Sequence, residues 1–172
     1  VMSIDSLQQP KKSLRFDSPQ QEAFLNLWRT YDRLKMLEDD LFGGYELTAQ
    51  QYNALRLLKA AHPHRVPTLL LGSQLVSRAP DITRLLDKLV ERGYIDRERP
   101  AENRRLVQVG ITQNGLALLA ELSDKVRECH QKQLWHLSES ELELLTQLLH
   151  KVREPHELTE GSWQEVAHQP SK

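Results

Sequence analysis

The segment 78–112 constrains the fold most, because it joins an amphipathic helix directly to a two-stranded hairpin. From Pro80 onward apolar residues recur every three or four positions, which is the period of a helix with one buried face. Residues 94–99 then read as a strand, and residues 106–111 as a second strand in which apolar and polar or small residues alternate. A polar tip with adjacent arginines joins the two strands, so the segment predicts a helix followed by a charged hairpin.

Most of the remaining chain has the period of helices. Capping boxes, in which a Ser or Thr is followed by Gln or Glu three residues later, predict helices after Ser18, Thr48 and Ser138. Thr112 caps a further long helix, and a short helix begins at 67–68. The order is therefore four helices, two strands and two helices. The fold is mainly α with a small β-hairpin wing, and the tight break between the third and fourth helices is typical of a helix-turn-helix.

The charge balance excludes a generally basic nucleic-acid coat, since 23 Lys and Arg stand against 24 Asp and Glu. Contact with a polyanion must then come from local clustering, and 78–105 holds eight basic and six acidic residues. One cysteine allows no intramolecular disulfide. No apolar run has the length of a membrane span or the form of a signal sequence. We expect a cytoplasmic protein with no membrane contact.

The fourth helix predicts the chemistry, because the N-terminal residues of a recognition helix face base edges in the major groove. Arg84 can donate two hydrogen bonds to guanine and the Thr83 methyl can contact thymine. Asp81 can cap the helix, accept from cytosine or orient an arginine, while Lys88 is placed to reach a phosphate. The candidates for DNA binding are Arg78, Pro80, Asp81, Thr83, Arg84 and Lys88 on the helix and Arg99, Asn103, Arg104 and Arg105 on the wing. The alternative is a winged helix that docks proteins and binds no DNA.

Two stretches resemble the multiple-antibiotic-resistance regulator (MarR) family of bacterial winged-helix transcription factors. DITRLLDKLVERGYIDRER is similar to the family's recognition helix and first wing strand. ENRRLVQVGIT followed by QNGLALL is similar to the wing motif D-x-R-x-x-x-V-x-L-T and the next helix. With the element order, the resemblance covers about 19–155. It departs at Asn103, which replaces the family's wing aspartate, so a looser wing is expected.

The resemblance implies a homodimer, most often a repressor, whose two lobes bind a palindromic operator. It also implies release of the DNA when a small phenolic or amphipathic molecule binds. Apolar stripes on three terminal helices favour a dimer independently, because a compact winged lobe would not bury them all. The alternative is a small bundle within one chain. The predicted dimerisation residues are Phe24, Leu27, Tyr31, Leu134, Leu142, Leu145 and Leu149.

These expectations divide the chain into five parts with separate roles. They are a flexible tail over 1–17, an N-terminal dimerisation helix over 18–47, a winged helix-turn-helix lobe that binds double-stranded DNA over 48–112, C-terminal dimerisation helices over 113–155, and a flexible tail over 156–172.

Other chemistry has little support in the sequence. Cys129 lies on an apolar stripe, so we expect a buried, inert thiol rather than a redox switch. The histidine spacings do not match a metal site, and no catalytic or cofactor motif is present, so neither an enzyme nor a cofactor is expected. The aromatic residues Trp28, Tyr31, Tyr45 and Tyr52 are candidates for lining an effector pocket, although aromatics at helical spacing more often belong to a core.

Overall fold

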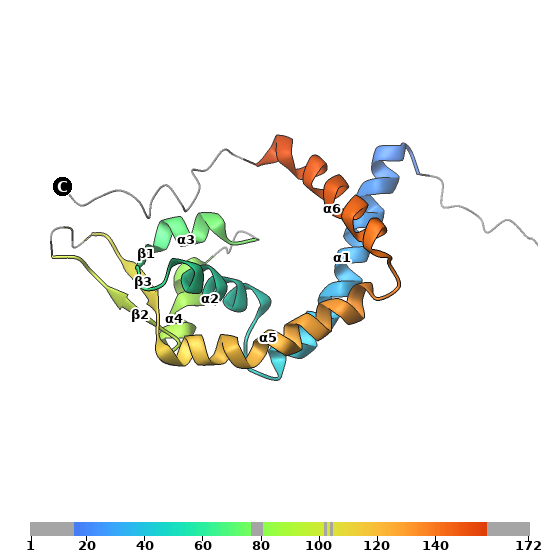
Figure 1. Ribbon diagram of the computed structural model, residues 1–172. Coiled ribbons are helices and arrows are strands. Elements are labelled where there is room, and N and C mark those ends of the chain that lie inside the picture. Colours follow the sequence, from blue (N-terminus) through green and yellow to red (C-terminus); the bar gives the residue numbers. More distant parts are fainter. Residues whose placement is uncertain (1–15, 77–80, 102, 104, 158–172) are drawn as a thin grey trace, which may run out of the picture. The chain divides into compact units, whose positions relative to one another are not determined.

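The computed structural model describes residues 16–76, 81–101, 103 and 105–157. Two compact units divide the chain within the first helix, between Met36 and Leu37. The elements (Figure 1) are, in order, α1 (Pro19–Gly43), α2 (Ala49–Ala61), β1 (Val66–Pro67), α3 (Thr68–Gln74), α4 (Ile82–Glu91), β2 (Ile95–Glu98), β3 (Gln108–Ile111), α5 (Gln113–Leu134), α6 (Glu139–Arg153) and the short 3-10 helix η1 (Glu154–His156). The winged helix-turn-helix fold predicted from the sequence is confirmed.

The first unit consists of most of α1, which begins where its cap predicts. Ser18 accepts a hydrogen bond from the backbone N–H of Gln21 at 3.1 Å. The reciprocal half of the predicted capping box is wrong, because the Gln21 side chain accepts from the backbone N–H of Asp17 instead. Asp17, assigned to the flexible tail, is thereby held to the first helical turn. Of the predicted tail, residues 1–15 lie outside the described residues.

The caps of the second unit form as predicted. The Thr48 hydroxyl accepts from Gln51 N–H at 3.2 Å, and the Gln51 side chain accepts from Thr48 N–H at 2.9 Å. Ser138 and Glu141 make the same reciprocal pair before α6. Each box satisfies N–H groups that have no partner within a first helical turn, so the sequence fixes these helix starts locally.

The sheet has three strands rather than the predicted two. β3 lies between β1 and β2, antiparallel to both, with Val66 opposite Val109 and Ile95 opposite Ile111. A two-residue strand is too short to give an alternating pattern, which is why sequence periodicity missed β1. Its Pro67 lacks an N–H and suits an edge position. The strands β2 and β3 project beyond the helices of this unit as a hairpin (Figure 1).

The core of the second unit brings together one face from each of its helices α2 to α5 and the sheet. Its largest fully buried side chains are Leu55, Leu58, Val66, Leu71, Leu86, Leu89, Ile95, Val109 and Leu122. Each fully buried Leu, Ile or Val contributes about 1.5–3 kcal/mol of transfer free energy. Because α4 buries its apolar side here, its polar side is turned toward solvent.

The start of α4 differs from the prediction. The helix begins at Ile82, and Asp81 is its N-cap, whose carboxylate accepts from the backbone N–H of Arg84 at 2.9 Å. Pro80, predicted to open the helix, lies outside the described residues, as do the other residues of the turn, 77–79. Of the three roles open to Asp81, the structure therefore supports capping.

The last two helices carry apolar side chains in quantity but bury them unequally. α5 buries Leu118, Leu119, Leu122 and Val126 against the lobe, whereas α6 has no buried residue. Among the described residues, no helix has both the length and the apolar character that crossing a bilayer requires.

Candidate nucleic-acid interface

The exposed side of α4 carries the predicted recognition residues. Thr83, Arg84 and Lys88 are all exposed, while Leu85, Leu86 and Leu89 on the other side are buried. The helical period puts these polar groups within one broad face. Arg78 and Pro80 lie outside the described residues, so the structure places only the part of the predicted set from Asp81 onward.

The wing tip is closed by its own backbone and by Asn103. Asn103 N–H donates to the Pro100 carbonyl at 3.1 Å, and Leu106 N–H donates to the Asn103 carbonyl at 3.0 Å. The Asn103 side chain accepts from the backbone N–H of Arg105 at 3.2 Å. Asparagine therefore still accepts a hydrogen bond at this position, from the backbone rather than from a guanidinium. Arg104 lies outside the described residues.

Two surface hollows on opposite sides of the α4 face divide the predicted residues. A groove of about 630 Å³ lies between the helix-turn-helix and the wing and brings Thr83 together with Arg99 and Arg105. Leu69 and Thr68 from α3 line the same groove. A shallower hollow beside the start of α2 gathers the others, namely Asp81, Arg84 and Lys88.

The cations of this surface differ in whether they form an ion pair with another described residue. Arg84, Lys88, Arg99 and Arg105 form no ion pair with any other residue that the structure describes. A solvated cation without an internal partner can neutralise a phosphate or donate to a base edge without first breaking a contact. The four predicted cations that can be placed are therefore the available ones.

Three arginines that sequence reasoning did not select hold the lobe together. Arg65 pairs with Asp96 at 2.5 Å and Glu98 at 2.7 Å, on the outer side of β2. Arg92 donates to the carbonyls of residues 45 and 46, at 2.9 and 2.8 Å, and so ties the end of α4 to the loop before α2. Arg97 bonds to α4. No spacing in the sequence signals these contacts, because their partners are distant in the chain.

The predicted dimerisation residues lie mostly on open surface. Phe24, Leu27 and Tyr31 on α1 are exposed, as is Leu145 on α6, while Leu134, Leu142 and Leu149 are half-buried. Further apolar side chains accompany them in the single chain, with Trp28, Met36, Leu37, Leu144, Leu148 and Val152 also exposed. On α6, residues 144, 148 and 152 are one turn apart and widen the predicted stripe.

The four candidate effector-pocket residues are divided between the two units. Trp28 and Tyr31 belong to the first unit, where they line an apolar patch with Phe24 and Leu27. Tyr45 is half-buried and donates to Glu121 at 3.0 Å. Of the four, Tyr52 alone lines the large pocket of the second unit.

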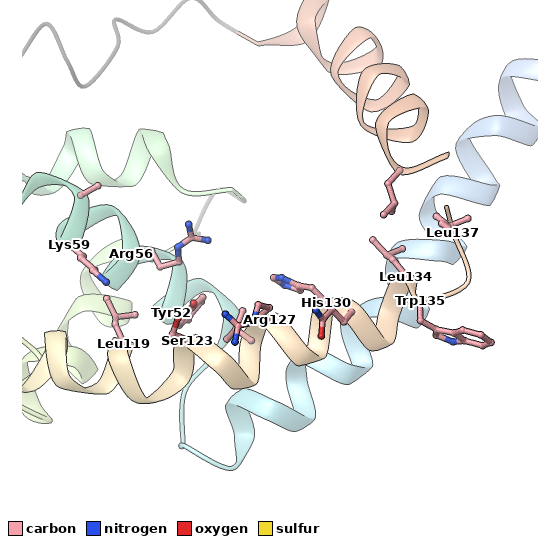
Figure 2. A pocket seen from close by; sticks show the side chains of 14 residues that line it. Tyr52, Arg56, Lys59, Leu119, Ser123, Arg127, His130, Leu134, Trp135 and Leu137 are labelled. Atoms are coloured by element: carbon pink, nitrogen blue, oxygen red, sulfur yellow. The ribbon is translucent and has the colours of Figure 1, made fainter. Parts of the chain in front are cut away.

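That pocket lies between α2 and the length of α5 and has a volume of about 1040 Å³ (Figure 2). Arg56 and Lys59 approach it from α2, and Ser123, Arg127 and His130 from α5. Apolar side chains such as Leu119 and Leu134 complete the lining. Burial raises the pKa of the Tyr52 hydroxyl, and the adjacent Arg56 opposes this, so Tyr52 stays a neutral donor at physiological pH.

Cys129 is half-buried rather than buried. Burial, and then the nearby Glu38 carboxylate, raise the pKa of its thiol, with Lys132 opposing them. Since the thiolate is the reactive form, the environment favours the unreactive thiol expected from the sequence. His130 lies 3.1 Å from Glu38. Within the described ranges, no three His, Cys, Asp or Glu side chains gather as metal ligands would.

The helix-turn-helix, the exposed polar face of α4 and the arginine-bearing hairpin together define a winged helix of the DNA-binding class. The chain belongs to the MarR family of transcriptional regulators, whose profile matches residues 47–107. A solved MarR transcription factor from Planctomyces limnophilus is 52% identical, with a TM-score of 0.64 over 78% of this chain and 98% of that one.

Two further relatives support this placement. The transcriptional repressor YetL of Bacillus subtilis is 32% identical over 60% of this chain, and the match spans 62% of the length of YetL. An Escherichia coli MarR mutant solved with operator DNA is 24% identical, with a TM-score of 0.69 over 76% of this chain and 93% of that one. The latter likeness concerns the fold alone.

Proposed function

We propose that this protein is a homodimeric, cytoplasmic repressor that binds a palindromic operator and leaves it when a small molecule binds. The single observation that carries the proposal is the set of available cations on α4 and the wing, Arg84, Lys88, Arg99 and Arg105. A helix in the major groove and a wing beside it would use them together. Arg84 reads bases, and the wing arginines hold the phosphate backbone.

The apolar surfaces of α1 and α6 support the dimer. Trp28 is 62% exposed and Val152 is 61% exposed in the single chain. Exposed stripes of this kind mark an interaction surface, and a two-fold dimer buries the same surface on both subunits. Two recognition helices related by a two-fold axis would read a palindrome. The MarR protein solved with operator DNA supports this arrangement by likeness of fold.

Selection from a genomic fragment library tests the DNA-binding proposal. We expect the full chain to enrich fragments that share a palindrome at moderate salt, and to elute as a dimer alone and as a dimer–DNA complex with the selected site. The observed affinity should fall steeply with salt, by about 0.9 in log K per unit of log salt for each phosphate contacted. A dimer that selects no palindrome would instead indicate a winged helix that docks proteins.

The pocket between α2 and α5 is the site that we propose for the effector, and an aromatic or amphipathic anion is the class that fits it. Arg56 and Lys59 form no ion pair with another described residue, and apolar side chains from α5 form the opposite side. Arg127 and His130 already face Asp124 and Glu38, at 2.7 and 3.1 Å. A carboxylate placed near Arg56 would pair with a cation that forms no ion pair with another described residue.

Thermal unfolding with hydroxybenzoates tests the pocket. A ligand at 100 times its dissociation constant stabilises the folded state by about 2.7 kcal/mol, so the melting temperature should rise with concentration. Arg56→Ala should weaken the response about tenfold, through loss of a charge-assisted hydrogen bond. Arg153→Ala on α6 is the matched control, outside the pocket lining. An equal response to the neutral hydroxybenzyl alcohols would contradict the anionic class.

A further inference from the structure

Arg97 connects the wing to the recognition helix. Its guanidinium Nη1 lies 2.5 Å from Asp87 Oδ1, and its Nη2 donates to the Thr83 carbonyl at 3.2 Å. Thr83 and Asp87 are one turn apart on α4, so a single guanidinium bonds to one complete turn of the helix. We call this arrangement the Arg97 bridge.

The turn that the bridge holds also carries the proposed base-reading residue, since Arg84 lies between Thr83 and Asp87 in the chain. On the wing side, Arg99 follows Arg97 by two positions and lines the same groove. Arg99 is the first residue after β2 (Ile95–Glu98), so a contact that holds the end of this strand also limits where Arg99 can lie. The bridge thus connects the turn that carries Arg84, expected in the major groove, to the strand that leads to Arg99, expected at the neighbouring phosphate backbone of the DNA.

The opposite face of β2 is held separately. Asp96 and Glu98, which alternate with Arg97, both pair with Arg65. Arg65 fixes the strand within the sheet, whereas Arg97 joins the strand to α4. The two sets of contacts have different consequences. Losing Arg65 removes the ion pairs that hold β2 within the sheet, whereas losing Arg97 leaves those pairs intact and removes the polar contact between the outer part of β2 and α4.

We infer that Arg97 is a positioning residue for operator binding, which couples the wing to the recognition helix without itself contacting DNA. The inference rests on the proposed DNA-binding function. The Arg97 charge is already balanced by Asp87, and its side chain is 29% exposed. A guanidinium used in this way contributes by preorganisation, since the DNA need not bring helix and wing into register.

Operator affinity measured as a function of salt tests the inference, with wild type, Arg97→Gln, Asp87→Asn, the double variant and Arg105→Ala. Arg97→Gln and Asp87→Asn should each weaken binding about three- to tenfold at fixed salt. Because the two residues form one bridge, the double variant should be no weaker than either single variant. The slope of log K against log salt should stay at the wild-type value for all three bridge variants, whereas Arg105→Ala should reduce it by about 0.9.

Hydroxyl-radical footprinting of the same complexes supplies a second readout. At saturating protein, Arg97→Gln should keep the wild-type protection under both α4 and the wing, because the bridge orders the wing before binding, and the charge-swapped pair Asp87→Arg with Arg97→Asp should regain part of the wild-type affinity. A slope reduced in Arg97→Gln as in Arg105→Ala, with Asp87→Asn unchanged, would overturn the inference and make Arg97 a phosphate contact. If the wild type binds no specific site, the proposed function fails and the inference fails with it.

Discussion

Arg84→Ala should weaken binding of the selected operator by about 1–3 kcal/mol, which is about 5- to 150-fold, and should relax the preference for one base pair. The side chain is exposed near the N-terminus of α4, where only its backbone N–H is used, by the Asp81 cap. Its guanidinium is therefore available to donate two hydrogen bonds to a guanine edge. Affinities for the operator and for a full set of single-base variants of it measure both effects.

Two comparison variants show whether Arg84 reads a base or contacts a phosphate. Arg105→Ala should weaken binding by a similar factor on every sequence and lower the salt slope, as expected of a wing residue that grips phosphate. Lys132→Ala on α5 removes an exposed cation outside the interface and outside the proposed effector pocket, and should leave operator affinity unchanged. An Arg84→Ala loss that was equal on all sequences would assign Arg84 to the backbone and remove its base-reading role.

Gly115→Ala should destabilise the lobe by about 3 kcal/mol or more, at the upper end of the overpacking range. A Cβ on Gly115 would meet the Tyr94 carbonyl oxygen at 2.3 Å and the Ile111 side chain at 2.7 Å. Tyr94 O also accepts from Thr112 N–H at 3.0 Å, where the wing runs into α5, so relief of the clash would disturb that junction. The melting temperature should fall by about 6–12 °C, and operator binding should be lost at lower temperature than in wild type.

Gly43→Ala provides the matched control for this substitution. Gly43 is the last residue of α1, and a Cβ there has no atom within 4 Å. Alanine favours helix over glycine by up to about 1 kcal/mol, so the melting temperature should stay constant or rise slightly. Equal melting temperatures for the two variants would mean that the close approach to Tyr94 is relaxed at little cost, contrary to the packing argument.

The sequence predicted the helices well because their signals are local. The Thr48 and Ser138 capping boxes and the Thr112 cap all form, and α2 ends before Pro63 as expected. A cap and an apolar period act within a few residues of the chain, so they can be read without knowing the tertiary fold. Where two local donors competed, prediction failed, and the Gln21 side chain accepts from the backbone N–H of Asp17 instead of that of Ser18.

The candidate interface was predicted in part because some of its signals are also local in the sequence. A helical period put Thr83, Arg84 and Lys88 on one exposed face, and a hairpin brought Arg99 and Arg105 close to each other. The division of this surface into two hollows was not predictable, because it depends on how α3, β2 and the start of α2 pack around α4. For the same reason the sequence does not predict that Tyr45 donates to Glu121 while Tyr52 lines the large pocket.

By itself the sequence determined the order of the elements, the amphipathic faces and which cations lie on the polar side of α4 and on the wing. Only the tertiary structure decided which arginines are not available. Arg65, Arg92 and Arg97 have the same chemistry as Arg84 and Arg105, yet their partners lie across the fold, on β2, the loop before α2 and α4. The physical reason is that a guanidinium binds whichever acceptor lies within reach, and packing places acceptors that are 10, 31 and 47 residues away in the chain beside it.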